Sequence, residues 1–444
     1  MSICVDLHDV EYGECIVLDS GREILMVDCG SSNRVIRGGN ISFFDSVRLQ
    51  IMPRYRDAEE RSFLLTHCHR DHLSGLWRIL RADPAYFDRL FLPVSPCGED
   101  GRPLLLEFAL YVYAFLSRMT EYSHMNTGVL RLFHRAAREA GAQRVYPIRA
   151  GDSFSFCGTD YDILWPPDDD FPFRDDFAAA VDAQDELLSS PYLPSVAGDF
   201  LRLKRGFCSA YASCCRNSPI LPEYAAETGA LLRQIGALAP MLRLLPCADE
   251  ICENLISPAN QRRYSDALNA SSVVFQNRRD GGAESLDILM TGDAPPETLA
   301  AVESNLYDGY FIVKAPHHGT KSAYAPLLEE IAADHILISN GVTGGKIAEE
   351  YAALPGIKHC SSNSVCAHFQ SAGSCCNRLS VCHDMPRPGL AVNCAGNRSA
   401  ANAGFGFFLG NRLLDISHSA PFCCIRVISA GCEKTCFCDI GKKT

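Results

Sequence analysis

The stretch THCHRDHLSGL, Thr66–Leu76, places three histidines and an aspartate within six positions. It continues the apolar run Ser62–Thr66, which is typical of a short buried strand. Apolar residues then recur at the spacing of one helix face, namely Leu73, Leu76, Trp77 and Leu80. This periodicity predicts an amphipathic helix. The histidine cluster is therefore expected in the loop between the end of a strand and the start of a helix.

The spacing within the cluster suits a pair of metal ions. Alternate side chains of an extended segment share a face, so His67 and His69 can bind one ion. Asp71 and His72 lie past the bend and can bind a second ion nearby. Imidazole and carboxylate ligands together favour zinc, with manganese or iron as alternatives. Cys68 points to the opposite face and is predicted to lie in the core. A polar surface loop is the alternative, which a single histidine would favour.

Two later segments supply further candidate ligands. Leu286–Asp293 is strand-like and ends in TGD, which places Asp293 at the carboxyl end of a strand. Tyr310–Thr320 ends in APHHGT, which does the same for His317 and His318. Loops at strand ends are where α/β sheets gather their functional residues. A lone aspartate there is most often a helix cap and paired histidines are usually surface residues. Together with the first cluster, however, both become candidate ligands.

The remaining patterns predict an α/β chain, because strand-like runs alternate with helical ones. Residues 1–345 are expected to form one domain, in which 168–262 is a mostly helical insertion. Residues 346–444 form a Cys-rich extension of unknown role. Further strands are predicted at Cys15–Asp19, Glu23–Asp28, Asp160–Pro167, Ser271–Gln276 and His335–Gly341, and further helices within 104–141, at Pro295–Leu306 and at Ala325–Ala333.

The composition is that of a folded protein with an acidic surface. Of its 444 residues, 47% are hydrophobic and 21% are charged, which excludes a disordered chain. The net charge of −12 opposes binding to a phosphate backbone unless a local basic or metal-bearing site offsets it. Met1–Val10 lacks the basic start and apolar block of a secretory signal, and the apolar run Leu104–Leu116 is too short for a membrane span. We expect a cytoplasmic protein with reduced thiols and no membrane association.

The motifs together resemble the metallo-β-lactamase superfamily. The chain is most similar to the hydrolase domain of competence (ComEC-type) DNA-uptake proteins, in its free-standing form. The resemblance covers roughly residues 1–345 and implies a four-layer αββα sandwich with the metal centre at one edge of the two sheets. The stretches that carry it, in the family's order, are DVEYGECIVLDSG, ILMVDCG, THCHRDHLSGL, NASSVVF, LDILMTGD and VKAPHHGTKS.

The resemblance also implies two divalent ions and a role for each candidate ligand. His67 and His69 would bind one ion, Asp71 and His72 would bind the other, and Asp293 would bridge them. Many members of the superfamily carry one further histidine between the first cluster and this aspartate. Only two histidines lie in that interval here, both in a helical stretch where a ligand is not expected, namely His124 and His134. A water molecule would then complete the coordination of the first ion.

The order of the paired histidines stays open. We favour His318 as the ligand that completes the second ion, which leaves His317 to contact or protonate the substrate. Asp71 and His317 are the candidates for a direct catalytic role. The resemblance further implies that Asp28 supports the centre by orienting a ligand histidine.

Three functions compete. A metal-dependent phosphodiesterase or nuclease is favoured, because two ions can bind one water, bring its pKa toward neutrality and stabilise charge on a phosphoryl oxygen. Lys314 and Lys321 flank APHHGT and are candidates for binding a substrate phosphate, with DNA as one such substrate; solvated lysines are the equally weighted alternative. Hydrolysis of a small ester, lactone or thioester is the second hypothesis. A non-catalytic module that binds a protein through the insertion or the Cys-rich tail is the third, although a complete ligand set argues against it.

The Cys-rich end is the least explained part of the sequence. Eleven of the 22 cysteines lie between Cys360 and Cys438. With His368 and His383 they could form a structural zinc site, but there is no Cys-x-x-Cys pair and the spacings match no familiar zinc finger. Small cysteines packed in a strand-rich tail are the preferred interpretation.

Overall fold

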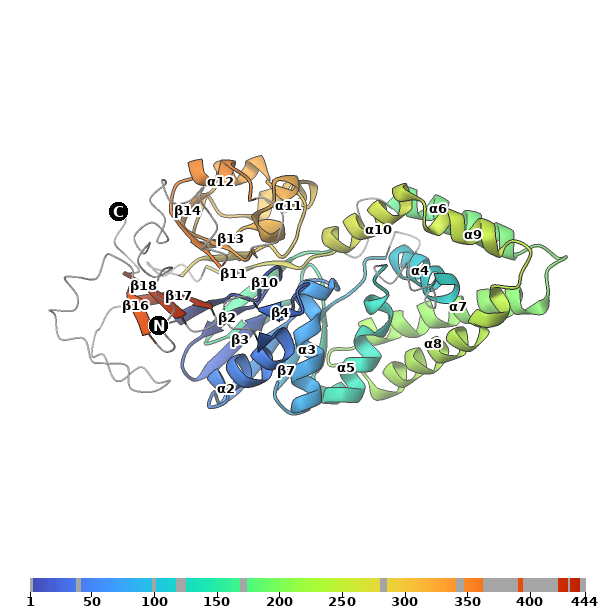
Figure 1. Ribbon diagram of the computed structural model, residues 1–444, viewed down its shortest axis with the longest axis horizontal. Helices are drawn as coiled ribbons and strands as arrows, with labels where there is room; N and C mark the ends of the chain where they lie inside the picture. Colours follow the sequence, from blue (N-terminus) through green and yellow to red (C-terminus); the bar gives the residue numbers. More distant parts are fainter. Residues whose placement is uncertain are drawn as a thin grey trace.

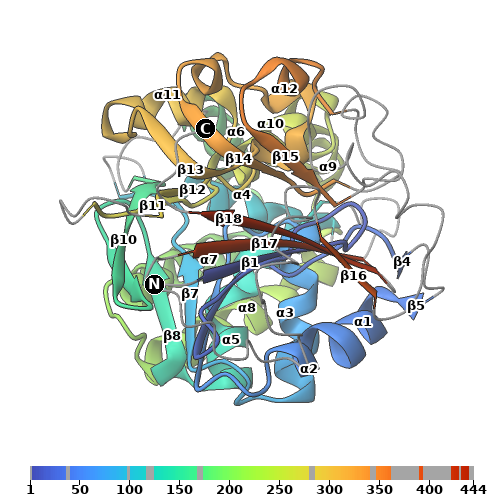
Figure 2. The ribbon, with the colours of Figure 1, turned by 90° about the vertical axis from the view of Figure 1, so that its left-hand side faces the viewer.

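The structure is a computed structural model in which two large sheets of mixed strand orientation carry helices on their outer faces (Figures 1 and 2). A helical unit extends from one end and makes the molecule elongated (Figure 1). No helix among the described residues combines the length and the apolar character that a membrane span requires. The described residues are 3–36, 41–97, 101–116, 125–167, 174–279, 286–340, 347–361, 390–393, 422–429 and 432–439.

The first sheet has nine strands in the order β16-β18-β17-β1-β2-β3-β6-β7-β8. Six of its strands come from the N-terminal part of the chain, namely β1 (Ile3–His8), β2 (Ile16–Asp19), β3 (Glu23–Val27), β6 (Glu60–Leu64), β7 (Arg89–Pro93) and β8 (Val145–Ile148). The strands predicted at Cys15–Asp19 and Glu23–Asp28 are confirmed as β2 and β3, which pair antiparallel. The strands from β3 to β8 are parallel to one another, which brings the carboxyl ends of β3 and β6 to the same edge.

Both faces of this sheet are buried, which explains the continuous apolar runs in its sequence. In β3, Leu25 and Val27 belong to an apolar core that also contains residues of the second sheet. Ile24 and Met26 point the other way, into a core shared with the helices on the outer face. The predicted amphipathic helix is confirmed there as α3 (Arg70–Ala82), whose buried face packs into that same core.

The second sheet has seven strands in the order β15-β14-β13-β12-β11-β10-β9. Helices α11 (Pro296–Val302) and α12 (Glu350–Ala353) cover its outer side (Figure 2). Its strands are β9 (Ser153–Phe156), β10 (Thr159–Trp165), β11 (Val274–Asn277), β12 (Ile288–Met290), β13 (Gly309–Lys314), β14 (Ala332–Ile338) and β15 (Ile357–Cys360). The run from β12 to β15 is parallel, so the carboxyl ends of β12 and β13 also lie together.

One predicted helix is wrong. The segment Ala325–Ala333 contains only a short 3-10 turn, Pro326–Glu329, and β14 already begins at Ala332. The reason is tertiary, because Ala332 pairs with Gly309 of β13 and its backbone is therefore committed to the sheet. Pairing to a long neighbouring strand outweighs the local helix preference of this Ala- and Glu-rich segment.

The expected helical insertion is confirmed over its described part, from residue 174 onward. It consists of α6 (Arg174–Leu188), α7 (Ser195–Cys215), α8 (Pro222–Leu242), α9 (Ala248–Leu255) and α10 (Pro258–Ala270). A buried ion network fixes it to α4 (Leu104–Tyr111). In this network Lys204 Nζ lies 2.7 Å from Glu107 Oε2 and 2.7 Å from Asp185 Oδ2. Removing one member of such a network would leave the others charged and buried, so the unit and α4 hold together as one body.

Parts of the Cys-rich extension belong to the two sheets. β15 is the edge strand of the second sheet, and β17 (Phe422–Ser429) pairs in parallel with β1 of the first. β18 (Cys432–Asp439) pairs with β17 and with β16 (Leu390–Asn393). Strands on both sides of residue 345 therefore share the same sheets. His368 and His383, considered for a zinc site, lie outside the described residues, so that hypothesis stays a prediction.

Candidate metal centre

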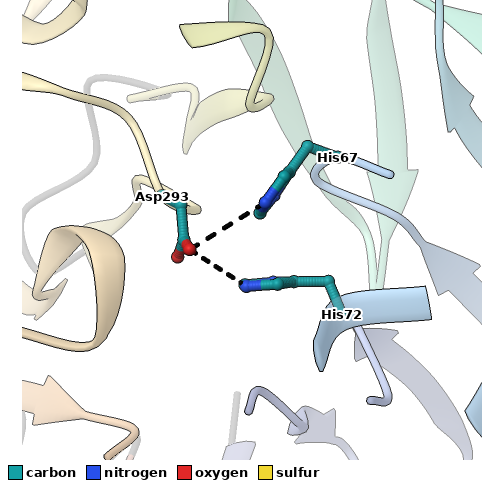
Figure 3. A group of neighbouring side chains, drawn as sticks. All are labelled: His67, His72 and Asp293. Atoms are coloured by element: carbon teal, nitrogen blue, oxygen red, sulfur yellow. Dashed lines mark hydrogen bonds and ion pairs between the residues drawn. The ribbon is translucent and has the colours of Figure 1, made fainter. Parts of the chain in front are cut away.

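The candidate ligands converge at one edge of the two sheets. β6 leads into the segment His67–His72, β12 leads into Asp293, and β13 leads into His317 and His318. Figure 3 shows Asp293 facing His67 and His72 across the space between the sheets. Parallel strands bring these three loops to the same place, which is why residues more than 200 positions apart meet.

The first cluster folds as its spacing predicts. His69 is the extended residue directly before α3, with φ −69° and ψ 153°, and Asp71 and His72 occupy the first turn of the helix. His67 Nε2 and His69 Nδ1 lie 3.0 Å apart, so these two side chains point to the same place. Cys68 is buried in the apolar core, which confirms its predicted packing role.

A close backbone approach holds the first turn of α3. A Cβ atom added to Gly30 would lie only 2.4 Å from the backbone nitrogen of His72, so no larger residue fits. On either side of this contact, Cys29 N donates to His72 O at 2.9 Å and Glu14 N donates to Asp71 O at 2.9 Å. The DCG segment therefore fixes the backbone from which two candidate ligands project.

Asp28 orients His72, as the resemblance implied. Its Oδ2 lies 2.7 Å from His72 Nδ1, and its carboxylate also accepts hydrogen bonds from Thr66 N at 2.7 Å and Thr66 Oγ1 at 2.6 Å. The contact to Nδ1 turns Nε2 of His72 toward Asp293, 3.2 Å away. A carboxylate behind a ligand histidine is the usual way in which proteins fix ring orientation at a metal.

Asp293 lies at the centre of the imidazoles. One of its oxygens, Oδ2, lies within 3.9 Å of four histidine nitrogens, which come from both the first cluster and the HH pair. The distances are 3.9 Å to His67 Nε2, 3.2 Å to His72 Nε2, 3.7 Å to His317 Nε2 and 3.4 Å to His318 Nε2. A single carboxylate oxygen in this position meets the requirement for a bridging ligand.

Three overlapping groups of side chains could hold a metal ion, with ligand atoms within 4.8 Å of one another. His72 is shared by two of these groups, and so are Asp293 and His318. The groups are His67, His72 and Asp293; Asp71, His72 and His318; and Glu14, Asp293 and His318. The overlap indicates one compact centre rather than separate sites.

The paired histidines differ in their surroundings. His318 is buried, its Nδ1 lies 2.8 Å from Ser339 O, and its Nε2 makes no hydrogen bond to any residue that the structure describes. That nitrogen lies 3.6 Å from Asp71 Oδ2 and 3.4 Å from Asp293 Oδ2. The side chain of His317 is 26% exposed and, like His69, it belongs to none of the three groups. These surroundings favour His318 as the ligand.

The backbone of the HH pair is strained. His317 and His318 both adopt left-handed conformations, with φ of 45° and 58°. Such residues cost about 1–3 kcal/mol each and persist where the surroundings hold them. Here His317 N donates to Gly292 O at 3.2 Å, and Asn340 Nδ2 donates to His318 O at 3.0 Å. The strain marks this turn as a functional segment.

The helical unit supports the centre from behind. Tyr264 of α10 donates a hydrogen bond of 2.5 Å to the carbonyl of Asn126, whose side chain in turn donates to the carbonyl of Cys68. After α10 the chain passes directly into the centre, where Ser272 Oγ accepts a 3.1 Å bond from the backbone nitrogen of Asp293. Sequence analysis gave no signal for these contacts.

Burial and charge set the protonation of the ligands. Burial lowers the pKa of both His67 and His69, which keeps their rings neutral and able to donate a lone pair. Burial also lowers the pKa of His72, but Asp293 and Asp28 outweigh it and raise that pKa well above its usual value. Some imidazoles are therefore ready to bind a metal, whereas others hold a proton that a metal must displace.

The same opposition governs the acids and His318. Burial raises the pKa of Asp293, but His318, His72 and His317 outweigh it and hold that pKa well below its usual value. Burial likewise opposes the charge on His318, but Asp293 and Asp71 raise its pKa. The carboxylate of Asp293 is thus ionised, and in the metal-free protein the protonated rings of His72 and His318 balance its charge.

We expect metal binding to stabilise the protein more as the pH rises. The raised pKa values of His72 and His318 mean that their protons stabilise the metal-free protein below about pH 6.5, and that this contribution is lost at higher pH. Zinc must displace those protons, so the shift in melting temperature between zinc-loaded and chelator-treated protein should grow from about pH 6 to about pH 8.5. Thermal scans at several pH values measure it. A shift that is equal or larger at acid pH would contradict this assignment.

No family model matches the chain, and no curated protein matches it. The fit of a metal therefore rests on the donor set itself. Neutral imidazoles, ionised carboxylates and a buried ring nitrogen without a hydrogen bond among the described residues are the donors that a divalent ion of the zinc or manganese kind requires.

Two residues at the centre were missed. Glu14 is buried, and its Oε2 lies 3.0 Å from Lys314 Nζ and 3.6 Å from His318 Nδ1. The ring of Tyr12 packs on that of His318, with 4.6 Å between centroids. Burial raises the pKa of Tyr12, and the charges of Asp293 and Asp71 raise it further. Both residues lie in EYGEC, between β1 and β2, where only their proximity in space assigns a role.

The two candidate lysines lie in different environments. Lys321 is exposed, in agreement with either a substrate contact or a solvated side chain. Lys314 is 1% exposed and donates a 2.6 Å hydrogen bond to Gly292 O, so the solvated alternative is wrong for this residue. Its predicted contact with a substrate phosphate would require release from Glu14, and the described contacts do not support it.

The remaining histidines of the interval were not expected to be ligands. His134 lies on α5 (Leu132–Ala140), half-buried, with its ring against Gly229 of α8. Burial and the neighbouring charges of Arg138, Arg131 and Arg233 lower the pKa of His134 to about 4. It is therefore a packed residue rather than a ligand. His124 lies outside the described residues.

Proposed function

We propose that this protein is a metal-dependent hydrolase of the metallo-β-lactamase type, and that it hydrolyses phosphodiester bonds. The observation that carries the proposal is the position of Asp293 Oδ2 among the nitrogens of four histidines. Two apposed sheets with helices on their outer faces, and a centre at their common edge, fit the four-layer αββα sandwich of that superfamily (Figure 2).

The donor set divides between two ions. His67, His69 and Asp293 would hold the first ion. The second would be held by Asp71, His72, His318 and the shared Asp293. When bound, the ions would supply Lewis-acid activation of water and of the oxygen that gains charge during hydrolysis. The chain then needs no serine or cysteine nucleophile.

His317 is the residue best placed for proton transfer to the substrate. Its ring is the more exposed of the pair, and its Nε2 lies 3.7 Å from Asp293 Oδ2. Burial lowers the pKa of His317, which keeps the ring neutral near pH 7 and able to exchange a proton. Asp71 has a different role. Burial raises its pKa, but His318 and His72 outweigh burial and hold it low, so Asp71 acts as an anionic ligand and not as an acid.

The choice of substrate rests on the resemblance and on two exposed cationic side chains. Lys321 follows the HH turn directly and is exposed. Arg262 of α10 is exposed as well. It and His317 both oppose the burial that raises the pKa of Asp266. These two cations favour an anionic substrate at an otherwise acidic protein.

One observation favours a second candidate, hydrolysis of a small ester, lactone or thioester. The ammonium of Lys314, which lies 3.6 Å from Asp293 Oδ1, is already engaged by Glu14 and Gly292. A long DNA backbone would therefore find few cations at the centre itself. This second candidate uses the same two-metal chemistry and differs only in the substrate that the site accepts.

Salt dependence distinguishes the two candidates. If DNA is the substrate, its cleavage should slow steeply with added salt, and the double substitution Lys321→Gln, Arg262→Gln should reduce that slope by about one unit per charge removed. The same variant should slow plasmid cleavage more than cleavage of a small chromogenic phosphodiester. Arg81→Gln is the matched control, because Arg81 is exposed at the far end of α3.

The assay supplies zinc, manganese and magnesium separately. Turnover of the small phosphodiester without any DNA cleavage would exclude a nuclease and leave a small-molecule phosphodiesterase. Turnover of esters or lactones alone would support the second candidate, and the absence of all turnover in metal-loaded protein would overturn the proposed function.

A further inference from the structure

Lys314 makes a set of contacts that hydrolysis does not explain by itself. Its ammonium lies inside the protein, 1% exposed, at the carboxyl end of β13. It donates a 2.6 Å hydrogen bond to the carbonyl of Gly292, lies 3.0 Å from Glu14 Oε2 and lies 3.6 Å from Asp293 Oδ1. One cation thus contacts the turn after β12, the loop between β1 and β2, and the bridging carboxylate.

A buried cation beside a metal centre needs a counter-charge, because it would otherwise repel the metal ions. Glu14 supplies it. This side chain is 2% exposed, and its backbone is fixed on both sides, by Glu14 N donating to Asp71 O at 2.9 Å and by Gly30 N donating to Glu14 O at 2.9 Å. The pair is therefore neutral as a unit and is attached to the backbone of another candidate ligand.

The turn that carries Asp293 depends on this contact. Gly292 has a positive φ of 51°, and a Cβ atom there would lie 2.9 Å from Thr66 Cβ and 3.0 Å from Ser272 Cβ. Its carbonyl accepts hydrogen bonds from both Lys314 Nζ and His317 N. Lys314 therefore contacts the turn next to Oδ1 of Asp293, while Oδ2 faces the four imidazoles.

We infer that Lys314 is a positioning residue, whose ammonium, neutralised by Glu14, holds the Gly292 turn by a hydrogen bond and lies beside Oδ1 of Asp293, so that Oδ2 faces the four imidazoles. This inference rests on the proposed metal centre and deepens it. It assigns to the Glu14–Lys314 pair the choice of which carboxylate oxygen bridges. It also replaces the substrate contact predicted for Lys314 by a contact behind the ligand.

The test separates positioning from simple stabilisation by a pair of charges. Three variants are compared with the wild type: Lys314→Met, Glu14→Gln, and the double variant Lys314→Met, Glu14→Gln. Two quantities are measured for each, namely the melting temperature of the metal-free protein and the dissociation constant for zinc in competition with a chromophoric chelator. Arg81→Met is the matched control, because Arg81 is exposed at the far end of α3 and lies outside the three groups of ligand atoms.

We expect each single variant to lower the melting temperature, because it leaves one buried charge without its partner, and to weaken zinc binding by about 10- to 100-fold. The double variant should recover the melting temperature, since no isolated charge remains. It should not recover zinc affinity, because no ammonium then holds the Gly292 turn that precedes Asp293. Arg81→Met should match the wild type in both quantities.

Two outcomes would overturn the inference while leaving the metal centre intact. One is a double variant that recovers zinc affinity together with stability, since the pair would then serve stability alone. The other is Lys314→Met protein that binds zinc as tightly as the wild type. If Lys314→Met does not fold, the double variant decides. Failure of the wild type to bind zinc or manganese at all would instead overturn the proposed function on which the inference rests.

Discussion

Replacing Asp293 with alanine should remove the bridge and weaken both metal ions at once. Its Oδ2 lies within 3.9 Å of nitrogens from both parts of the histidine cluster and from the HH pair. Loss of a supporting contact behind a metal ligand costs about 10- to 100-fold in affinity or activity, and loss of a shared ligand must cost more. We expect hydrolysis to fall below detection at micromolar zinc.

Elemental analysis of the purified variant measures this directly. Asp308→Ala is the matched control, because Asp308 is exposed and precedes β13 at the strand end away from the centre. Any zinc held by the Cys-rich tail is the same in both proteins, so only the difference between them counts. Two tightly bound ions remaining in the Asp293→Ala protein would contradict the bridging role.

Alanine substitutions of the two adjacent histidines should differ in kind. His318→Ala removes a buried nitrogen that lies 3.4 Å from Asp293 Oδ2 and 3.6 Å from Asp71 Oδ2, so it should lower the metal content. His317→Ala removes a half-exposed ring that belongs to none of the ligand groups. It should keep both ions and lower turnover by about 10²- to 10⁴-fold, the usual range for a lost proton-transfer group.

Metal content and turnover must be measured on the same samples, so that the two effects can be separated. A leaving group that needs no proton, such as nitrophenolate, should lose less in the His317→Ala protein than an alkyl ester does. If both variants retain full metal and full turnover, the HHGT turn is not part of the site. If His317→Ala loses the metal and His318→Ala keeps it, the two assignments must be exchanged.

The cluster from His67 to His72 could be predicted because its signals are local. An apolar run, a helix periodicity and the spacing of four polar side chains all lie within 20 consecutive residues, and β6 and α3 form where they indicate. Asp293 and the HH pair were predictable for a related reason, since each follows directly after a strand of a parallel run.

The Glu14–Lys314 pair could not be predicted, because it joins positions 300 residues apart, and nothing in the two stretches that contain these residues links one to the other. From the sequence, Lys314 suggested a solvated or substrate-binding lysine. Only the fold shows that its ammonium is turned inward. The helix predicted at Ala325–Ala333 was wrong for a comparable reason. The pairing of Ala332 with β13 is a long-range contact, which local helix propensity does not reflect.

The pairing of β17 with β1 has a consequence for how the protein avoids self-association. β1 contributes six residues, Ile3 to His8, to a parallel register with Cys423 to Ile428, so that one side of its backbone is occupied by a strand from the far end of the chain. Without the tail, β1 would be an open edge strand, and its unpaired N–H and C=O groups would offer a template for another copy of the chain. The Cys-rich end therefore covers β1, which would otherwise be an edge of the first sheet. A chain that ended near residue 345 would expose β1 and should self-associate more readily.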